Sequence, residues 1–166
     1  TTADWLIGND IMSSGEGIRS MSNPNLFQCP DTYHGDYWDY NQEVHTNSGV
    51  GNFWFYLLTN GGNGINDKGN IYNVNGIGIE KAAQIAYRTL TVYLTPSSNY
   101  ASARQYAIQS AIDLYGECSN ELIATTNAWY AVGVGDAYVS PLIASFTPSK
   151  TYSCTVPTTI TFTNTS

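Results

Sequence analysis

A helical repeat of apolar residues constrains this chain more than any other feature of its sequence. The spacing i, i+3, i+4, i+7, i+8, which places side chains on one face of a helix, is met by Val50, Phe53, Trp54, Leu57 and Leu58. The repeat stops at Asn60-Gly61-Gly62, and glycine commonly ends a helix. We therefore predict a helix over residues 47–59.

Three more helices are predicted after it. Apolar faces of the same kind indicate helices over residues 77–94, 98–116 and 119–132. We expect Ser97 or Ser98 to cap the helix over 98–116 and Ser119 to cap the last, because a hydroxyl accepts an N–H of the first turn. Residues 61–75 alternate weakly around a turn at 67–70, which predicts a small hairpin. Short connections between the helices imply antiparallel neighbours in one bundle.

The two ends of the chain differ from this middle part. Residues 1–46 show little periodicity and many turn-forming residues, which predicts irregular structure. Between Ser140 and Ser166 apolar residues alternate as in strands, namely Leu142, Ala144 and Phe146, then Ile160 and Phe162. Two strands bury no core of their own, so this tail is expected to begin another domain. The predicted fold class is mainly α, a helical bundle over residues 1–138 followed by a short β-strand tail over 139–166.

Composition excludes several classes of partner. Six basic residues against thirteen acidic ones give a net charge of −7, which disfavours nucleic acid as a partner. No apolar stretch approaches the roughly 18–20 residues that span a bilayer, so no membrane partner is expected. The three cysteines, Cys29, Cys118 and Cys154, form no CxxC pair and indicate no structural zinc site. The low charge and the many Asn, Thr and Tyr residues are more typical of a secreted protein than of a cytosolic one.

Eight short motifs then follow one another along residues 4–134. They are Asp4-Trp5-Leu6-Ile7-Gly8-Asn9-Asp10, Ile18-Arg19-Ser20-Met21-Ser22-Asn23-Pro24, Val44-His45-Thr46-Asn47-Ser48-Gly49, Gly76-Ile77-Gly78, Tyr87-Arg88-Thr89-Leu90, Tyr93-Leu94-Thr95-Pro96, Asp113-Leu114-Tyr115-Gly116 and Ala131-Val132-Gly133-Val134. In this order they resemble the carboxy-terminal, mainly helical half of the thermolysin family. That resemblance implies a lobe of a secreted zinc metalloendopeptidase, with a peptide or protein as substrate.

The same resemblance implies that zinc is bound outside this chain. In that family an HExxH helix supplies two zinc ligands and a Glu base, since histidines at i and i+4 share one helix face. This sequence contains two histidines, His34 and His45, and no HExxH. We therefore expect the zinc-binding half to lie upstream, to be a partner of this lobe, and to leave this chain inactive when alone. An HExxH encoded just before Thr1 would decide the matter.

The resemblance also implies roles for four residues on the other wall of the cleft. His45 would donate to the oxyanion of the tetrahedral intermediate, and Arg19 would hold a substrate carbonyl on the primed side. Ile11 and Ile18 would help line an apolar pocket for the residue after the scissile bond. Without the resemblance, His45 is as well explained by a capping or core role and Arg19 by a solvated loop. His34 is expected to be a surface residue.

The sequence departs from the family at two places. An Asp usually lies five residues before this histidine, where Tyr40 stands here; Asp39 is therefore the first candidate for its orienting acceptor and Glu43 the second. Asp4 keeps one position of the family's calcium site, but Leu6 and Asn9 occupy places where acids are expected. At most one weak calcium ion is expected at Asp4.

A rival interpretation comes from another functional class. Residues 145–166 resemble the opening strands of a polycystic-kidney-disease-type (PKD) β-sandwich, a module found behind the catalytic domain of secreted proteases. The helical part is then also consistent with a non-catalytic binding module attached to an adhesive β domain. The lost carboxylates favour this rival, and the retained Arg19 and His45 favour the protease.

Overall fold

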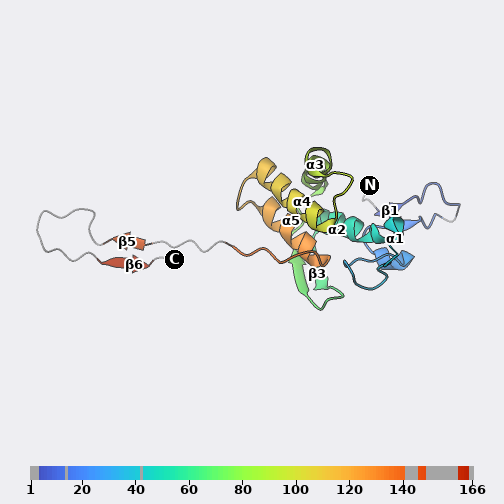
Figure 1. Cartoon of the computed structure of the whole chain (residues 1–166), viewed down its shortest axis with the longest axis horizontal. Helices are drawn as coiled ribbons and strands as arrows, with labels where there is room; N and C mark the ends of the chain where they lie inside the picture. The colour runs from blue at the N-terminus through green and yellow to red at the C-terminus, as the bar shows by residue number, and fades with distance from the viewer. Residues whose placement is uncertain (1–3, 14, 42, 141–145, 149–160, 165–166) are drawn as a thin grey trace, which may run out of the picture.

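The computed structural model describes residues 4–13, 15–41, 43–140, 146–148 and 161–164, and it is mainly helical (Figure 1). The segment before the bundle contains β1 (Leu6–Ile7), β2 (Arg19–Ser20) and the 3-10 helix η1 (Pro24–Phe27). The bundle with its hairpin consists of α1 (Val44–Asn47), α2 (Gly49–Asn60), β3 (Gly62–Ile65), β4 (Ile71–Val74), α3 (Ile79–Arg88), the π-helix η2 (Thr89–Tyr93), α4 (Tyr100–Tyr115) and α5 (Asn120–Ala131). Two short strands follow, β5 (Phe146–Pro148) and β6 (Phe162–Asn164).

The four predicted helices are confirmed, as α2, α3 with η2, α4 and α5. Ser119 caps α5 as expected, since its Oγ accepts the N–H of Leu122 at 3.1 Å. The predicted cap of α4 is wrong. Asn99 takes that place, with the extended backbone that a cap requires, and its Oδ1 accepts the N–H of Ser102 at 3.0 Å. The hydroxyl of Ser98 instead accepts the N–H of Thr95 at 2.9 Å and closes the preceding turn.

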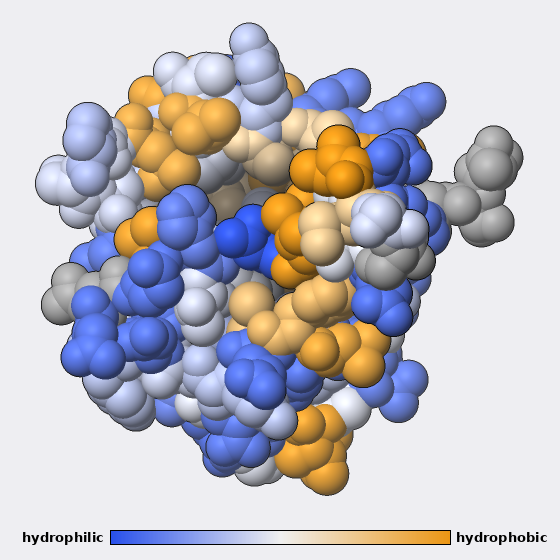
Figure 2. All heavy atoms as spheres, turned by 90° about the vertical axis from the view of Figure 1, so that its right-hand side faces the viewer, coloured by the Kyte–Doolittle hydropathy of each residue, from blue (hydrophilic) through white to orange (hydrophobic). Residues whose placement is uncertain are grey.

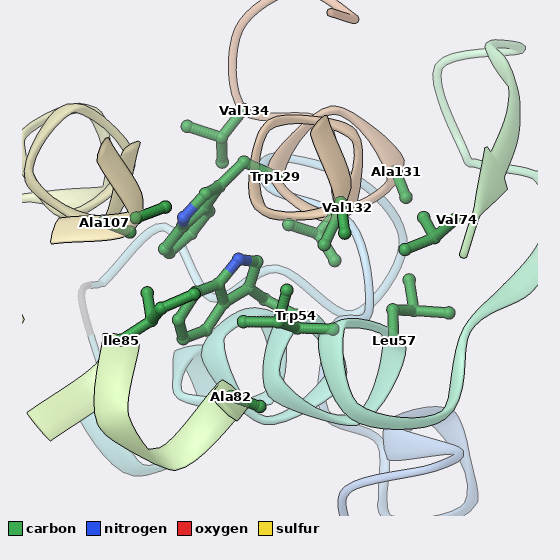
Figure 3. Packing of buried hydrophobic residues seen from close by; sticks show 14 of the residues in the cluster. Trp54, Leu57, Val74, Ala82, Ile85, Ala107, Trp129, Ala131, Val132 and Val134 are labelled. Atoms are coloured by element: carbon green, nitrogen blue, oxygen red, sulfur yellow. The ribbon is translucent and has the colours of Figure 1, made fainter. Parts of the chain in front are cut away.

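The hydrophobic core lies between α2 and α5, with α3 and α4 beside them. Trp54 and Trp129 stack at its centre with ring centroids 4.6 Å apart, as Figure 3 shows. Leu57, Leu58 and Ile85 are almost completely buried around this pair. Fully burying such an aliphatic side chain is worth about 1.5–3 kcal/mol, so these few residues contribute a large part of the stability of the bundle.

The predicted hairpin over 61–75 is also confirmed. Strands β3 and β4 pair antiparallel, from Gly62 opposite Val74 to Ile65 opposite Ile71. The side chain of Asn66 closes the turn, because its Oδ1 accepts the N–H groups of Lys68 at 3.1 Å and Asn70 at 3.0 Å. Its Nδ2 donates to the carbonyl of Ala131 at 3.1 Å, which attaches the hairpin to the end of α5.

The described residues before α1, which are 4–13, 15–41 and 43, have little regular structure, as predicted. The ring of Trp5 packs edge-on against Tyr56 of α2, with centroids 5.3 Å apart. The N–H of Tyr33 donates to the carbonyl of Val132 at 2.8 Å, which fixes the segment near the end of α5. The N-terminal segment touches the start of α2 at Gly49, where a Cβ atom would lie 2.3 Å from the carbonyl oxygen of Pro30. Only glycine fits there, and α2 begins at this contact.

The tail contains one short strand pair. β5 and β6 are antiparallel, with Phe146 opposite Asn164 and Pro148 opposite Phe162. The predicted alternation at Leu142, Ala144 and Ile160 lies outside the described residues, and the domain boundary after residue 138 stays a prediction. Among the described residues, no helix combines the length and apolar character needed to cross a bilayer.

Candidate functional site

The hairpin of β1 and β2 fixes the position of Arg19. Its strands pair Leu6 with Ser20 and Ile7 with Arg19. The N–H of Ile18 donates to the carbonyl of Ile7 at 2.8 Å, immediately before the pairing. Arg19 therefore projects from a hydrogen-bonded strand rather than from a free loop, and its side chain is half-buried.

Helix α1 fixes the position of His45. Glu43 is its N-cap, and the Oε1 atom of Glu43 accepts the backbone N–H of His45 at 2.8 Å. Asn47, two residues after His45, is buried. Its backbone carbonyl accepts the phenol O–H of Tyr100 at 2.8 Å. These contacts hold the backbone on both sides of His45, while its side chain is exposed.

The structure brings Arg19 and His45 together. The Nε atom of Arg19 donates to the backbone carbonyl oxygen of His45 at 3.1 Å. The hydroxyl of Ser48 donates to the same oxygen at 2.8 Å, so both of its lone pairs are used. Among the described residues, no hydrogen bond involves the two terminal nitrogen atoms of Arg19 or the ring of His45. Those groups remain open to a ligand.

The two predicted acceptors for the His45 ring do not contact it. The Oδ1 atom of Asp39 accepts the N–H of Asn41 at 2.6 Å, within its own turn. The backbone of Asp39 is held by Asn47, whose Oδ1 accepts its N–H at 2.9 Å and whose Nδ2 donates to its carbonyl at 2.8 Å. The carboxylate of Glu43 accepts a hydrogen bond from the backbone N–H of His45 and not from its ring. The orienting role of Asp39 therefore stays a prediction.

Ile11 and Ile18 lie beside one another near Arg19. A Cβ atom on Gly8 would lie 3.0 Å from Cγ1 of Ile18 and 3.6 Å from Cγ1 of Ile11, so both side chains converge on that glycine. Ile11 is 80% exposed and Ile18 is 43% exposed, which is unusual for two adjacent isoleucines. Figure 2 views the molecule from the right-hand side of Figure 1 and shows hydrophobic residues around a hollow.

The charge of Arg19 acts on its surroundings. Burial raises the pKa of the nearby Cys29 thiol, and the positive charge of Arg19 partly offsets that rise. Among the described residues Arg19 has no ion-pair partner, and such a cation beside an apolar patch favours a ligand that carries negative charge or a polarised carbonyl next to an apolar group.

A pocket beside α1 was not anticipated from the sequence. We call it the aromatic pocket; it has a volume of about 670 Å³ and is lined by Tyr33, His34, Trp38, Tyr40, Val44, Asn47, Ser48, Leu94, Ser98, Asn99, Tyr100 and Ala103. His34 is exposed, as expected, but its ring belongs to this aromatic cluster, 4.1 Å from the Tyr33 centroid. The crowding of aromatic residues between positions 33 and 40 was the available signal.

Comparison with known proteins decides the family. Residues 1–134 match the family described as thermolysin metallopeptidase, alpha-helical domain. The chain belongs to the thermolysin family. It is 44% identical over 138 residues to the thermostable neutral protease NprT of Geobacillus stearothermophilus, a match that covers 79% of this chain and 24% of that protein. Thermolysin of Alicyclobacillus acidocaldarius is 43% identical over 138 residues, with the same two coverages.

The match also defines how much of a thermolysin-like protein is present. Bacillolysin of Bacillus cereus is 43% identical over 136 residues, which are 79% of this chain and 23% of that protein. The chain thus spans about a quarter of the length of the curated relatives it matches. The matched part, residues 1–134, corresponds to the alpha-helical domain of that family.

The thermolysin family depends on zinc, and the residues described here do not fit a zinc site. Within them no group of three His, Cys, Asp or Glu side chains converges. The carboxylate of Asp4, the expected calcium ligand, has both oxygens in use: Oδ1 accepts the N–H of Leu6 at 3.1 Å and Oδ2 accepts Nδ2 of Asn9 at 2.7 Å. A weak calcium site at Asp4 stays a prediction.

Proposed function

We propose that this chain is the substrate-binding and oxyanion-stabilising lobe of a secreted zinc metalloendopeptidase. The observation that carries the proposal is the contact between Arg19 and the backbone of His45, because it unites two hydrogen-bond donors from distant segments at one surface. Donors that are already in place cost no reorganisation when negative charge develops, so they lower the barrier most. The zinc and its ligands would belong to the partner half of the protein, outside this chain.

In this proposal each residue of the candidate site has one task. The ring of His45 donates to the oxyanion of the tetrahedral intermediate, and the terminal nitrogens of Arg19 hold a substrate carbonyl on the primed side. Ile11 and Ile18 contact an apolar side chain that follows the scissile bond. Asp39 would orient the imidazole by exchanging its Asn41 contact for the ring. Residues 139–166 would begin a PKD-type β domain.

The rival function is a non-catalytic binding module. One observation favours it: the His45 ring has no acceptor among the described residues, so its tautomer is not fixed. Such a module would still use the exposed apolar pair of Ile11 and Ile18, but it would bind peptides without hydrolysing them.

Peptide hydrolysis distinguishes the two functions. We would measure turnover of a furylacryloyl dipeptide by the whole protein that contains this chain, and by the purified 166-residue chain with added zinc. The protease proposal predicts chelator-sensitive turnover by the whole protein and none by the chain alone. A folded whole protein that binds the peptide but does not cleave it would support the binding module instead.

A further inference from the structure

The aromatic pocket has a chemical character that the proposed catalysis does not use. Its wall is a connected set of rings: the centroid of Tyr33 lies 4.9 Å from that of Trp38 and 5.6 Å from that of Tyr100. The ring of His34 lies 4.7 Å from Trp38 and 5.8 Å from Tyr40. Tyr40 is 73% exposed at the rim. A ligand in this pocket would therefore meet several π-systems.

The pocket wall itself carries no basic side chain of Lys or Arg. In the described part of the adjoining segment, residues 33–41 and 43, the charged side chains are Asp36, Asp39 and Glu43. The contact of Lys68 shows that a ring of this cluster accepts a cation, since Nζ of Lys68 lies 5.4 Å from the Tyr33 centroid. Tyr33 shares that cation with the hairpin, whereas the rings of Trp38, Tyr40 and Tyr100 lie in the same wall of the pocket.

We propose that the aromatic pocket binds the basic side chain, Lys or Arg, of a peptide. The faces of aromatic rings attract cations through their quadrupole, and nearby carboxylates add to that attraction. The aliphatic stem of a Lys or Arg side chain can at the same time bury itself against Leu94 and the rings, as long basic side chains do.

The pocket adjoins α1, the helix that carries His45. Val44 and Ser48, which flank His45 in sequence, both line it. A peptide that passes His45 would therefore reach the pocket with a side chain a few residues from the one at His45. Selection of a substrate by such a basic residue rests on the proposed protease function, whereas binding of the basic side chain does not.

The test is an NMR titration of the 166-residue chain. The probes are Nα-acetyl-lysine methylamide and its matched control Nα-acetyl-norleucine methylamide, which keeps the four-carbon stem and lacks the ammonium group. One cation–π contact is worth about 2- to 30-fold in affinity, so we expect the lysine probe to bind at least about fivefold more tightly. Its shifts should map to the amides of Tyr40, Ser48 and Asn99 and should weaken as salt is added.

Two variants keep the result interpretable. Tyr40→Leu removes an exposed ring of the pocket without touching the core and should weaken the lysine probe several-fold. Tyr87→Leu, at a ring that is 69% exposed on α3 and outside the pocket, should leave the binding unchanged. Equal binding of both probes, shifts outside the pocket or no binding would overturn the proposal. Each of these results is independent of whether the whole protein hydrolyses peptides.

Discussion

The Nε atom of Arg19 lies 3.1 Å from the backbone carbonyl oxygen of His45, so the first hairpin and the start of the bundle meet at a peptide group. The Nε atom of the guanidinium is thereby used for structure. In the proposed function the two terminal nitrogens hold a substrate carbonyl, and a substitution can separate that proposed task from the structural one.

Arg19→Lys tests whether the positive charge of Arg19 is sufficient for activity or whether the planar guanidinium is also needed. Lysine keeps the positive charge but lacks the planar fork that donates from Nε and from the terminal nitrogens at once. Loss of one hydrogen-bond donor to developing negative charge typically lowers turnover about 10²–10³-fold. If the whole protein is a protease, we expect Arg19→Lys to lower turnover nearly as much as Arg19→Ala would. The measurement is kcat/KM with a dipeptide substrate.

A matched control for that measurement is Arg88→Lys. Arg88 lies at the end of α3 and pairs with Asp113, far in sequence from the hairpin, so this variant should keep full activity. If Arg19→Lys also kept full activity, charge alone would suffice and the contact with the His45 carbonyl would have no catalytic value.

Gly49→Ala should destabilise the fold strongly. A Cβ atom at this position would lie 2.3 Å from the carbonyl oxygen of Pro30, and a backbone atom cannot move aside as a side chain can. We expect a loss of about 2–4 kcal/mol in the free energy of unfolding, measured by urea denaturation.

Gly51→Ala in the same helix is the control. Its Cβ would meet Tyr100 Oη at 3.6 Å, an ordinary contact, and alanine is the better helix former by about 1 kcal/mol. The variant should therefore be neutral or more stable. Equal losses for both variants would contradict the account, because the contact with Pro30 would then not distinguish Gly49 from Gly51.

Asp113 should make stability depend on acid pH. Hydrogen bonds from Tyr93, Gln109 and Arg88 lower the pKa of Asp113 to about 2, below its ordinary value of 3.8. Because the folded pKa is the lower one, the ionised carboxylate stabilises the fold above about pH 4, and this contribution is lost as the pH falls toward about 2. Thermal melts across this range should show a shallower decline in Asp113→Asn than in the wild type.

The exposed Asp10 serves as the reference for that experiment, since no hydrogen bond of its carboxylate occurs among the described residues. Asp10→Asn should follow the wild-type profile. A wild-type profile that stays flat between about pH 4 and 2 would contradict the depressed pKa of Asp113.

Calcium should stabilise this chain little. Both carboxylate oxygens of Asp4 already accept hydrogen bonds, and its neighbours Leu6 and Asn9 carry no charge. A site with a dissociation constant near the calcium concentration adds only about 0.4 kcal/mol. Melting temperatures in millimolar calcium and in EGTA should therefore nearly coincide. A large upward shift would show that backbone carbonyls near Asp4 complete a site.

The bundle was predictable because its helices are encoded locally. Apolar spacing located α2, α3, α4 and α5, and the Ser119 cap followed from residue type alone. The α4 cap was predicted one or two residues early, since Ser97, Ser98 and Asn99 are all good caps and tertiary packing selects among them.

The candidate site was predictable only in part. The resemblance named Arg19 and His45, but their contact runs through a carbonyl group, which every residue possesses and no sequence pattern reveals. The position of Asp39 depends on two hydrogen bonds between its backbone and the side chain of Asn47, and a backbone partner is equally invisible in the sequence. The aromatic pocket joins residues 33–40 and 44–48 to residues 94–103, a long-range contact that local spacing does not encode.

The central claim is that His45 is an oxyanion donor, and kcat of His45→Ala in the whole protein tests it most directly. Among the described residues the imidazole makes no hydrogen bond, so its removal should leave the melting temperature unchanged. Loss of one oxyanion donor should lower kcat about 10²–10³-fold, with little change in KM. An unchanged kcat, or a rise in KM alone, would contradict the account and return His45 to a structural role at the start of α1.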